Sequence, residues 1–128
     1  VSKNLSANFA MIIFPEGTTN NGKKVLKFRT SLFKIFEDDP TLGLQNFSLC
    51  YTHINSMPLD NRMRPNIAWY GEMSLVSHLK RLLNYSSIRA KLKFHPMNVP
   101  YGIKRKVISD QSREQVIKGI NALSNNLQ

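Results

Sequence analysis

The sequence is poor in three kinds of feature: cysteine, acidic side chains and long apolar runs. Cys50 is the only cysteine and has no second thiol for an internal disulfide, so we predict a buried structural thiol in a reducing compartment. No apolar stretch approaches the roughly 18 residues that a membrane span requires. The histidines and the cysteine form no cluster with metal-ligand spacing, so we predict no metal site and no cofactor.

The shortage of acids leaves a strongly basic chain. Eighteen Lys and Arg face eight Asp and Glu, which gives a formal net charge of +10. The bases recur in small groups: Lys23/Lys24/Lys27/Arg29, Arg62/Arg64, Lys80/Arg81, Arg89/Lys91/Lys93 and Lys104/Arg105/Lys106. Dispersed charge is most often a solvated surface. It also suits an anionic membrane surface, a polyanionic ligand or nucleic acid.

Nucleic acid finds no further support in the sequence. The chain has no zinc spacing, no convincing helix-turn-helix signal and no paired aromatics in an RNA-binding strand motif. We therefore expect no nucleic-acid partner, and keep a basic nucleic-acid-binding domain as an alternative of a different class.

The length of 128 residues and the 41% hydrophobic content predict one folded domain. Strands are predicted at 9–14, 46–52, 66–70 and 88–94, and helices over 28–36, over 75–83 and from Ser109 or Asp110 to 123. In 88–94 apolar and basic residues alternate, so we expect the apolar side chains to point to one side of the strand and the basic side chains to the other. Strands separated by helices indicate an α/β fold, a mixed sheet of about four strands with flanking helices.

The most informative stretch follows the first predicted strand. It runs Phe14-Pro15-Glu16-Gly17-Thr18-Thr19, then a polar loop, then a segment that contains Phe28-Arg29-Thr30-Ser31-Leu32-Phe33. Pro-Glu-Gly after an apolar run is also an ordinary strand-ending turn. An acid at the carboxyl end of a buried strand, beside free N–H groups and cations, suits a polar, anionic ligand.

Together these residues resemble the Phe-Pro-Glu-Gly-Thr block of the glycerolipid acyltransferase family, which includes the 1-acylglycerol-3-phosphate acyltransferases. Weaker likenesses continue through residues 44–51, where Asn46 replaces a family Pro, and through 68–83. The resemblance implies that residues 1–128 are the carboxyl-terminal part of one acyltransferase domain. It implies a substrate-binding set made of Phe14, Pro15, Glu16, Gly17, Thr18, Thr19 and Arg29.

The family's catalytic signature, a His followed five positions later by an Asp, is absent. Five positions after His53, His78 and His95 stand Pro58, Leu83 and Pro100. The family places the dyad before the Phe-Pro-Glu-Gly-Thr block, and the chain starts Val-Ser-Lys-Asn without Met. We therefore predict a fragment that contains no catalytic residue, is inactive alone, and has its general base upstream.

The resemblance implies that the parent protein moves a fatty acyl group from acyl-CoA or acyl carrier protein to the hydroxyl of a lysophospholipid, foremost 1-acylglycerol-3-phosphate. A lyso-ornithine lipid is the alternative acceptor, because related bacterial enzymes share this variant of the motif. Thr19 stands where many members carry Arg, so one candidate phosphate ligand is missing. The expected location is the cytoplasmic face of an anionic membrane, peripheral or anchored through an upstream segment. A catalytically dead membrane-binding module is the remaining alternative.

Overall fold

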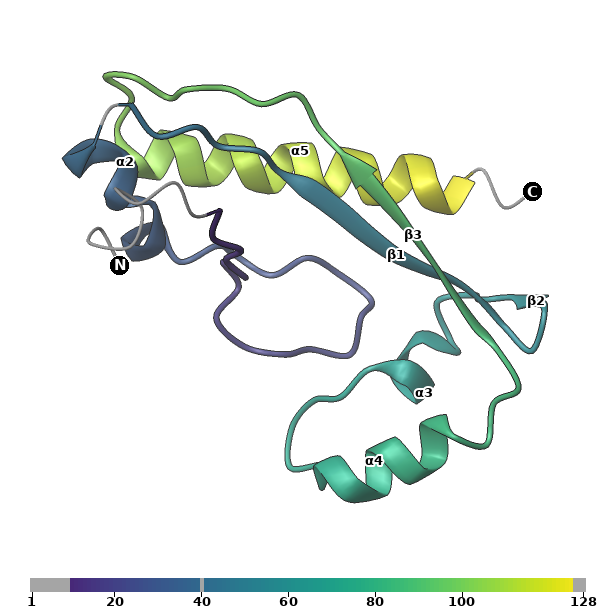
Figure 1. Ribbon diagram of the computed structural model, residues 1–128. Coiled ribbons are helices and arrows are strands. Elements are labelled where there is room, and N and C mark those ends of the chain that lie inside the picture. The colour runs from purple at the N-terminus through teal and green to yellow at the C-terminus, as the bar shows by residue number, and fades with distance from the viewer. Residues whose placement is uncertain (1–9, 40, 126–128) are drawn as a thin grey trace.

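The structure is a computed structural model that describes residues 10–39 and 41–125. Its elements are the 3-10 helix η1 (Thr30–Phe33), α2 (Ile35–Asp38), β1 (Phe47–Ile54), β2 (Met57–Pro58), α3 (Arg64–Ile67), α4 (Leu75–Leu82), β3 (Ile88–Phe94) and α5 (Arg105–Asn125). In Figure 1 the ribbons of β1 and β3 run as one long pair beside α5, and α3 and α4 lie toward the end of the pair near β2. The predicted class, an α/β fold with helices flanking a sheet, is confirmed.

The sheet has the strand order β2-β1-β3, and both pairings are antiparallel. β1 and β3 pair from Phe47 opposite Phe94 to Ile54 opposite Ile88. The two-residue turn between β1 and β2 has positive φ at Asn55, 49°, and at the following serine, 65°. Turns with this backbone shape match the twist of a hairpin, and Asn is among the residues that tolerate it.

One face of this ladder is covered by α5 and is lined by small or polar side chains. Ser48 and Cys50 are buried there, and Ser48 Oγ donates to the main-chain oxygen of Val116 at 3.0 Å. A Cβ at Gly119 would collide with Ser48 Oγ and come within 2.7 Å of His95 Nε2. Glycine weakens a helix by about 1 kcal/mol relative to alanine. Its presence here is explained by the close approach of helix and strand.

A compact apolar cluster packs around the amino-terminal end of α5. It joins the segment around η1 and α2 to the start of α5 and to the isolated β-bridge between Leu44 and Asn98. Its members are Phe28, Phe33, Phe36, Leu44 and Ile108. The rings of Phe28 and Phe33 stack with their centroids 6.3 Å apart. This cluster fixes the end of the polar loop that follows Glu16.

The second face of the ladder is apolar and open. Directly paired residues share a face, so Phe47 with Phe94 and Leu49 with Leu92 lie together, and Phe94 is 62% exposed. The apolar side of 88–94 is therefore exposed in the described structure. The alternation was read correctly, but α5 packs on the opposite side of the ladder.

Several element predictions need correction. The part of the 9–14 strand that lies within the described residues, 10–14, forms no ladder, and a strand needs a partner for its N–H and C=O groups. The predicted strand at 66–70 is the end of α3 and irregular chain. Within the described part of the chain the sheet has three strands, all antiparallel, where a mixed sheet of about four was expected. The last helix begins at Arg105, ahead of the predicted cap. Among the described residues, no helix is long and apolar enough to cross a membrane.

Candidate functional site

The predicted site begins with a tight turn over Phe14–Gly17. Gly17 N–H donates to the oxygen of Phe14 at 3.1 Å, and Gly17 has a φ of 64°. Pro15 suits the second position of such a turn because its φ is fixed, and glycine tolerates the left-handed backbone without strain. The turn places the Glu16 side chain, which is partly buried, beside the polar loop that follows.

Glu16 is held through one of its two carboxylate oxygens. Oε2 accepts hydrogen bonds from Asn20 Nδ2 at 2.8 Å and from the Leu26 N–H at 3.0 Å. Within residues 10–39 and 41–125, Oε1 accepts no hydrogen bond. One oxygen therefore fixes the carboxylate, and the other remains available to a cationic or hydrogen-bond-donating ligand.

Arg29 lies over the same turn. The main-chain N–H of Arg29 donates to the main-chain oxygen of Pro15 at 2.7 Å, which joins the two ends of the polar loop. A Cβ on Gly17 would meet the Arg29 side chain, with the Cδ only 2.6 Å away. Glycine thus lets the Arg29 side chain cross the turn. The structure brings Glu16, Gly17 and Arg29 of the predicted substrate-binding set together, with a carboxylate and a guanidinium around one turn; their role in binding stays a prediction.

The other predicted site residues are less enclosed. Phe14 is 72% exposed, and Thr18 and Thr19 are exposed, with Thr18 Oγ1 donating to the oxygen of Thr19 at a long 3.5 Å. The loop lysines are exposed as well: Lys23, Lys24 and Lys27. Around the carboxylate the surface is therefore rich in cations that face solvent.

A broad open cavity of about 1520 Å³ extends from this turn. Its walls come from the segment before Glu16, from β1, from α3 and α4 and from the last turns of α5. Apolar side chains such as Ile13, Leu49 and Ile120 line much of it, and Glu16 lies at its wall. This combination of an apolar wall and a polar end suits an amphiphilic molecule.

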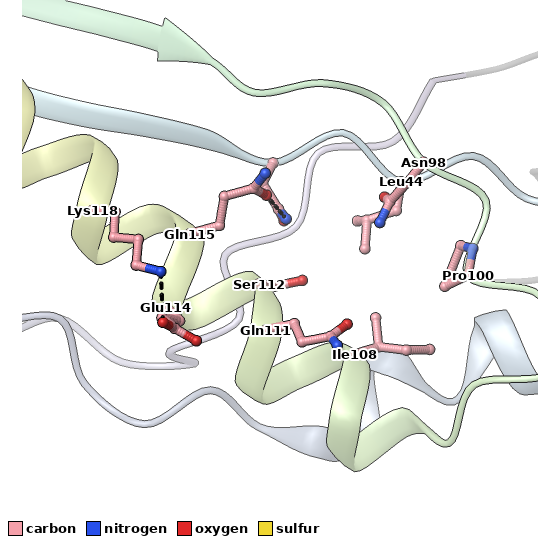
Figure 2. A pocket seen from close by; sticks show the side chains of 10 residues that line it. Leu44, Asn98, Pro100, Ile108, Gln111, Ser112, Glu114, Gln115 and Lys118 are labelled. Carbon is pink, nitrogen blue, oxygen red and sulfur yellow. Dashed lines mark hydrogen bonds and ion pairs between the residues drawn. The ribbon is translucent and has the colours of Figure 1, made fainter.

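A second, smaller hollow of about 280 Å³ lies between the first half of α5 and the Leu44–Asn98 bridge. Figure 2 shows its polar side chains, among them the exposed ion pair of Lys118 Nζ with Glu114 at 2.7 Å. Residues of the predicted substrate-binding set do not line it. The hollow is therefore separate from the Glu16 turn.

Ser48 and His95 form a buried pair that sequence reasoning missed. Ser48 Oγ and His95 Nε2 are 2.8 Å apart, but Ser48 is fully buried and its hydroxyl proton is donated to Val116. His95 Nε2 is then the donor to Ser48, so the ring cannot act as its base. Burial, and then the positive charge of Lys93, lower the pKa of His95. The pair stabilises the helix–sheet contact and is not a catalytic dyad.

Three interactions at the predicted site were also missed: those of Asn20, Leu26 and Arg113. Arg113 on α5 donates from Nε to the oxygen of Leu26 at 2.8 Å and from Nη2 to the oxygen of Val25 at 2.9 Å. Asn20 lies four residues after Glu16, so its spacing was a visible signal. The main-chain contacts of Leu26 and the distant Arg113 leave no local signature in the sequence.

Comparison with known proteins gives three relatives with one name. The chain is 31% identical over 123 residues to the lyso-ornithine lipid O-acyltransferase of Brucella abortus (strain 2308), a match covering 91% of this chain and 46% of the relative. It is 32% identical over 100 residues to the protein of that name from Rhizobium meliloti (strain 1021), covering 73% and 34%. A third, from Rhodobacter capsulatus, is 31% identical over 90 residues, covering 67% and 31%.

The chain is homologous to part of an acyltransferase. The family resemblance predicted from the Phe14–Thr19 block is thereby confirmed. The chain spans less than half the length of these curated relatives. No family model matches it. No solved structure matches it.

Proposed function

We propose that the chain is part of an acyltransferase that moves a fatty acyl group from a thioester donor, acyl-CoA or acyl carrier protein, to the hydroxyl of a lyso-ornithine lipid. The support is the shared name of three relatives and the Glu16 turn beside an apolar cavity. In the reaction the acceptor hydroxyl oxygen bonds to the acyl carbon, the C–S bond breaks, and the hydroxyl proton passes to a base. The thiol leaves.

The charges at the turn fit an ornithine head. Ornithine carries an ammonium group and a carboxylate, which are complementary to the Glu16 carboxylate and the Arg29 guanidinium. Glu16 presents Oε1 while Oε2 is anchored, and Arg29 is exposed above Gly17. A zwitterionic head needs one anion and one cation, whereas a phosphate needs cations alone. This supports lyso-ornithine lipid over 1-acylglycerol-3-phosphate as the acceptor.

The identity of residue 19 also favours lyso-ornithine lipid as the acceptor. Thr19 stands where many glycerolipid acyltransferases carry Arg, so one candidate phosphate ligand is missing. The exposed lysines of the loop, Lys23, Lys24 and Lys27, are the feature that favours a phosphate instead. For this reason 1-acylglycerol-3-phosphate is the second candidate acceptor, and both must be assayed side by side.

The catalytic base is proposed to lie outside residues 1–128. The sequence contains no His followed five positions later by Asp, and the buried His95 is committed to Ser48. The chain would supply the acceptor-head site, and its basic surface would face an anionic membrane on the cytoplasmic side.

Lipid analysis of a suitable host tests the proposal. A bacterium that makes lyso-ornithine lipid but cannot acylate it would express the natural full-length protein, with the 128-residue chain expressed alone as the control. We expect ornithine lipid to form only with the full-length protein. Formation of phosphatidic acid in its place would favour the second acceptor. If a well-expressed, membrane-bound protein forms neither lipid, the acyltransferase proposal is wrong.

A further inference from the structure

Arg113 lies far from the Phe14–Thr19 block in sequence, yet it contacts the loop that holds Glu16. Its guanidinium spans two consecutive carbonyls, with Nε 2.8 Å from the oxygen of Leu26 and Nη2 2.9 Å from the oxygen of Val25. The planar guanidinium presents its donors in a fixed fork, so it fits two neighbouring acceptors at once. A lysine ammonium has no such geometry. The contact therefore fixes both the position and the direction of this short segment.

The same segment holds the acid. Leu26 donates its N–H to Glu16 Oε2 at 3.0 Å, while its carbonyl oxygen accepts from Arg113. Leu26 is thus the link between a helix anchored in the core and the carboxylate of the turn. Ile108, one turn before Arg113 on α5, is buried in the phenylalanine cluster, which gives Arg113 a rigid base. The exposed polar loop itself offers only Asn20 as a second anchor for Glu16.

We propose that Arg113 is a positioning residue for Glu16, acting through the main chain of Val25 and Leu26. This inference rests on the proposed function, in which Glu16 binds the acceptor head. Without the guanidinium the two carbonyl oxygens accept hydrogen bonds from water instead, and the segment shifts. The Leu26 N–H then no longer points at Glu16 Oε2. The free oxygen of Glu16 then loses its fixed direction. Misplacement of a binding group by about 1 Å can cost on the order of a hundredfold in rate.

The first test measures the link itself. Amide hydrogen exchange at Leu26 is compared in the wild type and in Arg113→Gln, Glu16→Ala, which removes the acceptor of the Leu26 N–H, and Lys118→Gln. Lys118→Gln is the matched control, because it removes one positive charge from an exposed, solvent-facing pair of the same helix. We expect exchange at Leu26 to rise about tenfold in the first two variants and to stay at the wild-type rate in the control.

The second test separates positioning from general stability. In the full-length protein we expect Arg113→Gln to lower kcat/KM for lyso-ornithine lipid by about tenfold while KM for the acyl donor stays unchanged. Arg113→Lys should recover part of the loss, since it keeps the charge but not the fork. The double variant with Glu16→Gln should lose no more than Glu16→Gln alone, because both changes remove the same interaction.

The outcomes are distinct. If folded Arg113→Gln shows wild-type exchange at Leu26 and wild-type acceptor kinetics, Arg113 does not position Glu16. If Arg113→Gln lowers the kinetics of donor and acceptor alike, its role is only structural and the proposal is also overturned. If Glu16→Gln leaves acceptor kinetics unchanged, the proposed site fails, while exchange at Leu26 still decides whether Arg113 holds the segment. Should Arg113→Gln fail to fold, the same two readouts on Arg113→Lys decide.

Discussion

The two faces of the β1–β3 ladder are built from opposite kinds of side chain. The face against α5 carries the small, polar Ser48 and Cys50, both buried, and meets the helix at a glycine. The other face carries large apolar side chains, of which Leu92 and Phe94 are exposed. Exposed apolar surface of this extent marks a contact surface more often than a solvated one. The comparison teaches that one face of the ladder is finished, because α5 covers it, and that the other is open, because its large apolar side chains remain exposed.

The same contrast holds along the chain. β1 and β3 pair with each other from Phe47 to Ile54, whereas the apolar segment 10–14 has no strand partner among the described residues. Changes on the finished face should therefore cost stability in this chain, and equal changes on the open face should not.

The largest expected effect is at Gly119. Gly119→Val would push a branched side chain into Ser48 and His95, and we expect the free energy of unfolding to fall by about 3 kcal/mol. Denaturant unfolding followed by circular dichroism measures this. Asn121→Val, at an exposed position of the same helix, is the matched control and should cost less than about 1 kcal/mol. A loss in Gly119→Val no larger than that in Asn121→Val would mean that close packing against β1 does not set the effect.

A smaller effect follows from His95, because burial and then the charge of Lys93 lower its pKa. A histidine whose pKa is depressed in the folded state binds fewer protons there than in the unfolded state, so stability rises with pH across the interval between the two values. We expect stability to fall as the pH drops below about 6.5, the ordinary pKa of histidine, and to level off below the folded value. Urea midpoints between pH 7.5 and 4.5 measure this.

Two variants sharpen the pH prediction. His95→Gln should remove this part of the pH dependence, although acids elsewhere add their own. His53→Gln, on β1 and away from the Ser48–His95 contact, is the matched control and should keep the part of the pH dependence that His95 contributes. An unchanged profile in His95→Gln would show that the buried imidazole does not carry the effect.

The smallest expected effect is on the open face. Leu92→Gln replaces an exposed apolar side chain, and we expect the free energy of unfolding to change by no more than about 0.5 kcal/mol. Binding of a dye specific for exposed apolar surface should fall in the same variant. A loss above about 2 kcal/mol would mean that the open face is part of the core of this chain, which would end the contrast between the two faces.

Sequence reasoning succeeded where a local pattern decides the structure. The strict alternation at 88–94 placed β3 at its observed bounds, Ile88–Phe94. It could not tell which side is buried, because that depends on where α5 packs. The apolar run before Glu16 has the composition of a strand, but strand pairing depends on a partner elsewhere in the molecule. Ser109 was predicted as a helix cap, yet it is buried inside α5, which begins four residues earlier.

The candidate site divides in the same way. Glu16, Gly17 and Arg29 were predicted from two short segments separated by a polar loop, and the turn brings them together because Gly17 has no side chain to keep Arg29 away. Arg113 was not predicted, since its two hydrogen bonds go to main-chain oxygens that carry no residue identity. Long-range contacts to the backbone are the part of such a site that a single sequence leaves out.

The most direct test of the account is the acceptor kinetics of Glu16→Gln in the full-length protein. The substitution keeps the shape and the anchoring hydrogen-bond acceptor but removes the charge. With lyso-ornithine lipid as acceptor we predict a loss of at least about tenfold in kcat/KM, roughly 1.4 kcal/mol. Glu72→Gln, at an exposed position away from the cavity lining, should behave like the wild type. Wild-type kinetics in a folded Glu16→Gln protein would contradict the account and leave Glu16 an ordinary turn residue.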